Sequence, residues 1–228
     1  PCAPDPTTYA DALEILARYR CAAPPAVLQT LQRGVRGELS ETPKPGDPIF
    51  ARTENRVIAT AQQSLQAAAD YFAAQGIPAV VLGDSVTGEA RAIAALHAAL
   101  AREVATRGLP WRAPLALISG GECTVTVRGK GRGGRCAEFL LALTTELQGQ
   151  ADVHALAGDT DGIDGSEDNA GAISAPDTLA RAAALGLNAQ QHLSNNDGYG
   201  FFSALGDLVI TGPTRTNVND YRAILVGV

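Results

Sequence analysis

The chain has 228 residues, of which 46% are hydrophobic, and a formal net charge of −6. This composition is that of a globular protein with one substantial core, and the acidic balance disfavours a general nucleic-acid-binding role. The sequence has no apolar run near the ~20 residues that a membrane-spanning helix needs, so no membrane partner is predicted. The four cysteines lack C-x-x-C spacing, which favours free thiols and a cytoplasmic location.

The first part of the chain predicts two short helices and a linker. One helix is capped by Thr7 or Thr8, and a second starts at Pro24-Pro25 and is stopped by Gly34. Residues 35–55 are rich in proline, cannot form regular backbone hydrogen bonds, and are predicted to be a linker. We place a domain boundary there, separating residues 1–50 from residues 51–228. Because the chain contains no methionine, even at position 1, we expect it to be a piece of a longer protein.

Beyond the boundary, short apolar runs alternate with helical patterns. The expected strands are residues 56–59, 79–82, 115–119, 124–127, 153–157, 208–210 and 221–226. The expected helices are residues 61–75, 89–107, 135–147, 177–185 and 196–205. Such alternation predicts an α/β fold, a three-layer α/β/α sandwich. A hairpin between 115–119 and 124–127 would make its sheet mixed but mostly parallel.

Polar loops directly follow four of the predicted strands. These loops are residues 82–85, 119–122, 158–162 and 211–214. In open α/β sheets, ligands bind in the crevice outside the carboxyl ends of the strands. We therefore expect the four loops to meet at one edge of the sheet and to form a single site.

A glycine-rich loop with four cations, residues 128–135, precedes a predicted helix. Glycine lets backbone N–H groups approach an anion, and a helix N-terminus attracts negative charge. Arg135 is the expected anion ligand, because its planar guanidinium can bind phosphate or carboxylate through two hydrogen bonds. Further substrate or phosphate contacts are expected from Gly120, Gly121, Lys130, Arg132 and Gly134. The alternative is a flexible basic hairpin without a ligand.

Three carboxylates occupy residues 159–164, a spacing that does not match an EF-hand. Mg²⁺ commonly takes one or two carboxylates plus substrate phosphate, so Asp161 and Asp159 are the predicted metal ligands. The alternative is a loop of Asx turns that caps the next helix.

Hydroxyl and amide groups are concentrated in residues 211–220. Thr214, Thr216 and Asn217 are expected to bind a polar small molecule, and the alternative is a turn that hydrogen-bonds to itself. Glu122 follows two glycines at a strand end. It could act as a base, a metal ligand or the charge partner of Arg135.

Together these segments resemble the C-terminal MOFRL domain of class II glycerate kinases, a family whose members often carry the older name hydroxypyruvate reductase. The segments that carry the resemblance are residues 119–122, 129–135, 159–165 and 211–220. Residues 4–9 and 42–48 are similar to segments that close the family's N-terminal domain. The resemblance implies ATP- and Mg²⁺-dependent phosphorylation of D-glycerate, usually to 2-phosphoglycerate, in a cleft between two α/β domains.

In that family, the residues that correspond to Glu122, Arg135, Asp161 and Asn217 line the cleft. The N-terminal domain supplies a catalytic lysine and is nearly absent here, so the chain alone is expected to be incomplete for catalysis. That domain is the expected partner, and a homodimer is left open. Two alternatives remain. One is an NAD(P)H-dependent hydroxypyruvate reductase, which the G-x-G-x-x-G spacing of 129–134 would suit, and the other is a non-catalytic domain that binds a small acid.

Overall fold

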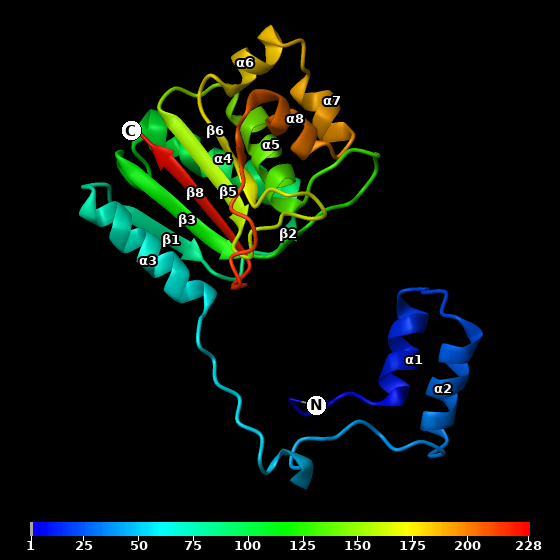
Figure 1. Ribbon diagram of the computed structural model, residues 1–228. Coiled ribbons are helices and arrows are strands. Elements are labelled where there is room, and N and C mark those ends of the chain that lie inside the picture. Colours follow the sequence, from blue (N-terminus) through cyan, green and yellow to red (C-terminus); the bar gives the residue numbers. More distant parts are fainter. Residues whose placement is uncertain (1) are drawn as a thin grey trace. The chain divides into compact units, whose positions relative to one another are not determined.

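The computed structural model describes residues 2–228, which divide into two compact units, one ending at Ile58 and the other spanning Ala59–Val228 (Figure 1). In the first unit, α1 (Tyr9–Arg18) and α2 (Pro25–Val35) pack together, and a 3₁₀ turn (Pro48–Phe50) follows. Thr8 caps α1 as predicted, since its hydroxyl accepts a hydrogen bond from the Asp11 N–H. Neither helix buries a side chain, because Gly34 is their one buried residue.

The predicted strand at residues 56–59 is wrong. This segment is extended and exposed, and it has no strand partner in the described part of the chain. The predicted boundary near residue 50 lies a few residues before the point at which the two compact units divide.

The second unit is built on a six-stranded sheet with the order β1-β3-β8-β5-β6-β7. Its strands are β1 (Ala79–Gly83), β3 (Leu115–Gly121), β5 (Val153–Asp159), β6 (Gly171–Ser174), β7 (Leu208–Val209) and β8 (Asp220–Val226). The helices are α3 (Ala61–Ala74), α4 (Ala90–Arg107), α5 (Arg135–Leu147), α6 (Thr178–Ala184), α7 (Ala189–Ser194) and α8 (Gly198–Leu205). The α/β class is confirmed, whereas β6 and α7 have no counterpart in the sequence-based prediction.

The sheet is mixed, as predicted, but its strand pairs are mostly antiparallel. The pair β1–β3 is parallel, and the four other neighbouring pairs are antiparallel. The reason is that β8, the last strand of the chain, inserts between β3 and β5 and runs against both. Four strands, β1, β3, β5 and β7, nevertheless point in the same direction.

The predicted hairpin after β3 is also wrong. The segment that follows β3 forms β4 (Cys123–Thr124), which pairs in parallel with β2 (Gly88–Glu89) in a separate two-stranded sheet. The glycine-rich loop therefore leaves the main sheet, and its position is set by other elements.

Helices lie on both faces of the sheet, but unequally (Figure 1). On the inner face, α4 and α5 bury Leu117, Phe139 and Ile224 in the main core, together with residues of α6, α7 and α8. On the outer face, α3 packs Leu65 against Ile118 and forms a smaller core. The three-layer arrangement is thus complete over β1 and β3, where every residue of β3 is buried.

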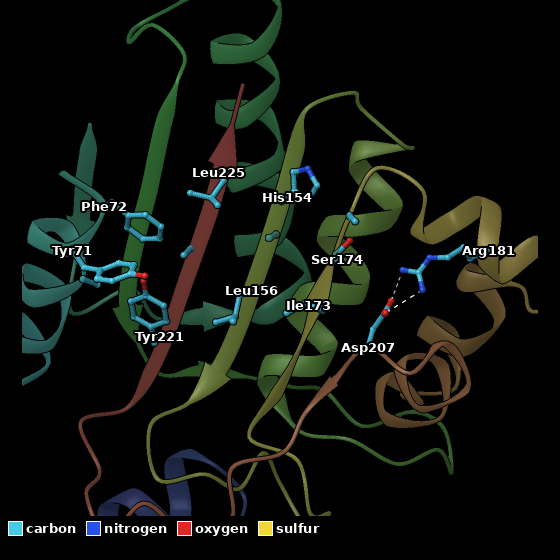
Figure 2. Close-up of a pocket in the computed structure, with 14 residues that line it drawn as sticks. Tyr71, Phe72, His154, Leu156, Ile173, Ser174, Arg181, Asp207, Tyr221 and Leu225 are labelled. Atoms are coloured by element: carbon cyan, nitrogen blue, oxygen red, sulfur yellow. Dashed lines mark hydrogen bonds and ion pairs between the residues drawn. The ribbon is translucent and has the colours of Figure 1, made fainter. Parts of the chain in front are cut away.

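No helix among the described residues covers the outer face of β8, β5 and β6. Figure 2 shows that Tyr221, Leu156 and Ile173 line a hollow there, and Tyr71 and Phe72 of α3 border it. The hollow measures about 590 Å³ and is mostly apolar. Burial along β5 alternates accordingly, since its inward residues are buried and its outward ones are not.

Candidate active site

The structure confirms that the four polar loops meet at one edge of the sheet. Because β1, β3, β5 and β7 share one direction, the loops that follow them leave from the same edge. The antiparallel strand β8 begins at this edge, so that Asp220 lies opposite Gly121 of β3 and Asp159 of β5. The edge therefore gathers side chains from segments about 100 residues apart in the sequence.

Arg135, the first residue of α5, lies at the centre of this edge. Its Nε donates to Asp220 Oδ1 at 2.7 Å and its Nη2 to Asp159 Oδ2 at 2.6 Å. Its Nη1 lies 3.5 Å from Glu122 Oε1. The predicted pairing of Arg135 with Glu122 is thus present, but the two aspartates hold the guanidinium more closely.

The cluster around Arg135 is acidic. Glu122, Asp159, Asp161 and Asp220 contribute four carboxylates, whereas Arg135 and Arg222 contribute two guanidiniums, which leaves a formal charge of −2. Burial opposes the charge of Arg135, but the hydrogen bond and charge of Asp220 and the charge of Asp159 raise its pKa. Burial also raises the pKa of Asp159.

Asp161 and Asn217 are in direct contact, as the single-site prediction requires. Asn217 Nδ2 donates to Asp161 Oδ2 at 3.2 Å, and the Thr214 N–H donates to the Asp161 carbonyl at 3.0 Å. Asp161 joins the arginine cluster, because its N–H donates to Asp159 Oδ1 at 3.2 Å. The loop after β7 also bonds to itself, since the Thr216 N–H donates to Thr214 Oγ1 at 3.4 Å. Both alternatives that the sequence left open therefore apply to this loop: it hydrogen-bonds to itself, and it also contacts Asp161.

A dedicated metal cage is not formed by the described residues, since no three His, Cys, Asp or Glu side chains converge to hold an ion. Asp159 is engaged through both oxygens and its side chain is only 4% exposed. Asp161 is more accessible and accepts one hydrogen bond on each oxygen, from Ile163 N and Asn217 Nδ2. This donor set fits Mg²⁺ only when phosphate oxygens complete the coordination.

The glycine-rich loop is not an open anion cradle. The turn between α7 and α8 occupies the backbone N–H groups of residues 128–132: Asn196 Oδ1 accepts from Arg128 N at 2.8 Å and Gly129 N at 3.0 Å, and the Asn195 carbonyl accepts from Gly131 N at 2.9 Å. Asn195 Oδ1 accepts from Lys130 N at 3.0 Å, and Asp197 Oδ1 from Arg132 N at 3.0 Å. We call this set of contacts the asparagine clasp, made by residues 195–197.

The N-terminus of α5 is also occupied. Asp164 accepts hydrogen bonds from Cys136 N at 2.9 Å and Ala137 N at 2.8 Å, so a side chain fills the position at which a phosphate was expected. Burial raises the pKa of Asp164 to about 6, although these two N–H groups oppose the shift. The glycine at the helix start serves this contact, since a Cβ on Gly134 would lie 2.2 Å from Asp164 Oδ1.

The remaining predicted ligands lie at the margin of the site or inside the sheet. Lys130 and Arg132 are exposed, and Arg132 faces Glu167 at 3.3 Å. Gly120 and Gly121 are buried residues of β3, and a Cβ on Gly121 would lie 2.4 Å from backbone atoms of Val86. The structure thus gives these two glycines a packing role, and contact with a substrate stays a prediction.

Several residues of the site were missed from the sequence: Asp220, Arg222, Asp164 and the asparagine clasp. A charged residue inside the apolar strand 221–226 was the available signal for Arg222. Asp220 belongs to the polar segment 211–220, in which other residues were predicted as ligands. Nothing in the local pattern connects residues 195–197 with a loop about 65 positions earlier.

Comparison with known proteins gives a consistent result. The MOFRL family model matches residues 115–220. The chain is 48% identical over 223 residues to an Agrobacterium vitis protein named "Putative hydroxypyruvate reductase", covering 97% of the chain and 56% of that protein. It is 36% identical over 220 residues to D-glycerate 2-kinase of Thermotoga maritima, covering 96% of the chain and 50% of that protein.

Solved structures agree with this. The crystal structure of a glycerate kinase from Thermotoga maritima matches with a TM-score of 0.79 at 35% identity, over 98% of this chain and 51% of that one. The chain spans about half the length of the relatives that it matches. Among residues 2–228, no helix has the length and apolar character needed to cross a membrane.

Proposed function

We propose that this chain, which belongs to the MOFRL-domain, glycerate kinase-like family, is part of a kinase that transfers phosphate from ATP to D-glycerate with Mg²⁺, giving 2-phosphoglycerate. The observation that carries the proposal is the acidic cluster at the sheet edge, where Arg135 holds Asp159 and Asp220 beside Asp161. Phosphoryl transfer depends mainly on positioning and on neutralising charge, and carboxylates that can share a metal with phosphate suit it.

The reaction assigns separate tasks to the side chains of this edge. The 2-hydroxyl oxygen of glycerate attacks the γ-phosphorus of ATP, the bond from that phosphorus to the bridging oxygen breaks, and ADP leaves. Glu122, whose side chain is 57% exposed, would accept the hydroxyl proton. Asp161 would hold Mg²⁺, which would draw charge from the phosphate oxygens, and Asn217 would fix Asp161. Arg135 would donate from Nη1 to a substrate oxygen.

A net charge of −2 on this edge opposes the binding of a polyanion such as ATP. Further cations have to come from Mg²⁺ and from the part of the longer relatives that this chain lacks. We therefore propose that the missing N-terminal region is its functional partner. The exposed apolar residues of α1 and α2, such as Ile15, Val27 and Val35, support this, because a helix pair with so little buried surface needs further packing.

The reductase alternative is weakened by the occupied loop. In a dinucleotide-binding fold, the pyrophosphate lies on free N–H groups at a glycine loop and helix N-terminus. Here residues 195–197 take the N–H groups of residues 128–132, and Asp164 takes two N–H groups at the start of α5. The loop also follows β4, which is outside the main sheet.

The test is an assay of the intact protein that contains this chain. ADP formation from glycerate and ATP should depend on Mg²⁺, phosphorus NMR should show the 2-phospho ester, and NADH should not be consumed with hydroxypyruvate. Asp161→Asn should lower kcat/KM at least ~100-fold. The control is Asp177→Asn, which changes an exposed carboxylate at the N-cap of α6 and should leave kcat/KM unchanged. NADH oxidation without ADP formation would favour the reductase, and calorimetric binding without turnover would favour a binding domain.

A further inference from the structure

Arg222 places a charge inside the core. It is 1% exposed, it lies on β8 in line with Ile224 and Val226, and its guanidinium lies 5.2 Å from the centre of the Phe139 ring. Taking a charged group out of water costs several kcal/mol, and a buried pair is often no more stable than apolar residues of the same volume. Apolar residues in place of both Arg222 and its partner Asp220 would avoid this cost, so stability alone does not explain the buried pair.

The shortest hydrogen bond of Arg222 goes to Asp220. Its Nη2 donates to Asp220 Oδ2 at 2.6 Å and lies 3.1 Å from Cys123 Sγ. Its Nη1 reaches the Gly120 carbonyl at 3.4 Å, and its Nε is buried without a partner among the described residues. Because Arg222 leaves one N–H group without a partner but binds the Asp220 carboxylate closely, it is better suited to orienting that carboxylate than to stabilising the fold.

Asp220 joins two guanidiniums. Its side chain is fully buried, Oδ2 accepts from Arg222, and Oδ1 accepts from Arg135 Nε at 2.7 Å. Arg135 then reaches Asp159 at 2.6 Å. The order of contacts is therefore Arg222, Asp220, Arg135 and Asp159, running from the core to the site. Only Arg135 among these four is appreciably open to solvent, with a side chain 24% exposed.

We propose that Arg222 is a positioning residue: it fixes the carboxylate of Asp220 and, through it, the orientation of Arg135 toward the substrate. The expected effect of Arg222 on catalysis rests on the proposed function, whereas its contact with Asp220 does not. Arg222 touches no substrate. Without the Arg222 guanidinium, Oδ2 of Asp220 would keep only the long hydrogen bond from the Cys123 N–H at 3.5 Å. The carboxylate could then bind Arg135 in another geometry, and Nη1 of Arg135 would no longer be held at the site.

The first test observes Arg135 directly in the full chain. The Nε–Hε NMR signal of Arg135, assigned by its loss in Arg135→Lys, should be shifted downfield and protected from exchange, because Asp220 accepts from it. Arg222→Met should broaden this signal or shift it upfield, and Arg222→Lys should largely keep it. Arg181→Met is the matched control, because it breaks another arginine–aspartate pair, with Asp207 at 2.7 Å, outside the cluster.

The second test uses the kinetics of the intact protein. Arg222→Met should lower kcat at least 30-fold, with the KM for ATP within threefold of the parent. Arg222→Lys should recover most of that loss, and Arg181→Met should leave kcat unchanged. If Arg222→Met is too unstable, Arg222→Gln is interpreted in the same way.

An unchanged Arg135 signal in folded Arg222→Met, or a kcat within threefold of the parent, would overturn the inference. A parent protein without glycerate kinase activity would overturn the proposed function instead, and the Arg135 signal would still decide the role of Arg222.

Discussion

The asparagine clasp gives the sharpest prediction about stability, because one side chain, that of Asn196, makes two of its four side-chain contacts. Asn196 is 6% exposed. Its Oδ1 accepts two backbone hydrogen bonds, at 2.8 and 3.0 Å, and its Nδ2 donates to Glu138 Oε1 at 3.0 Å. Asn196→Ala removes these three bonds, together with a longer one from Nδ2 to the Thr126 carbonyl at 3.4 Å, and it leaves the N–H groups of Arg128 and Gly129 without their acceptor.

The expected loss follows from these contacts. Three hydrogen bonds at ~1 kcal/mol each give about 3 kcal/mol. The backbone of Asn196 has φ +53°, a left-handed conformation that asparagine tolerates and alanine disfavours by ~1 kcal/mol. Asn196→Ala should therefore lower the free energy of unfolding by about 4 kcal/mol.

The assay is equilibrium unfolding in urea, followed by circular dichroism, with hydrogen exchange at Arg128 and Gly129. Asn196→Gly removes the same bonds but accepts the backbone conformation, so it should lose about 1 kcal/mol less than Asn196→Ala. Asn195→Ala loses a single exposed bond and should cost ~1 kcal/mol. The reasoning is refuted if Asn196→Ala loses no more than Asn195→Ala, or if exchange at the two amides does not speed up.

Three further predictions concern other parts of the second unit. The raised pKa of Asp164, about 6, means that the folded state holds its proton more tightly, so stability should fall as pH rises from 4 to 6; Asp164→Asn should flatten this slope in unfolding curves. Gly162 has φ +94°, and a Cβ at this position would lie 2.1 Å from the Gly212 carbonyl, whereas Gly212 has φ +65° and a Cβ there would meet open space. Gly162→Ala should therefore lower Tm by several degrees more than Gly212→Ala, and equal effects would contradict the steric reasoning. The buried thiols of Cys123 and Cys136, whose pKa values burial raises, should resist alkylation in the native state, whereas the two exposed thiols react; mass spectrometry would count them, and four modified thiols would refute the burial.

The general architecture of the site could be predicted from the sequence because it depends on local patterns. Strands followed directly by polar loops predicted that the site lies at one edge of the sheet, and the predicted residues lie there. Arg135 contacts Glu122, Asn217 contacts Asp161, and Asp159 connects the two pairs. The periodicity that identified the helices is likewise local, and α4 and α5 occur close to the predicted ranges.

The features that could not be predicted depend on contacts between distant residues. Nothing in residues 221–226 shows that they insert between β3 and β5, and this insertion both makes the sheet antiparallel and brings Asp220 to Arg135. The glycine-rich loop looked like an anion site because its own residues permit one. Whether its N–H groups are free depends on residues 195–197, which the loop sequence does not encode.

The register of β8 restricts how this protein can change length during evolution. Along this strand, Asp220 and Arg222 face inward with Ile224 and Val226, while Tyr221 and Leu225 face outward. Because side chains alternate in a strand, gain or loss of a single residue within β8 would turn the two charged groups to the outer face and send a tyrosine into the core. Insertions and deletions should therefore be confined to the loop before residue 214, where the chain can absorb them without reversing that alternation.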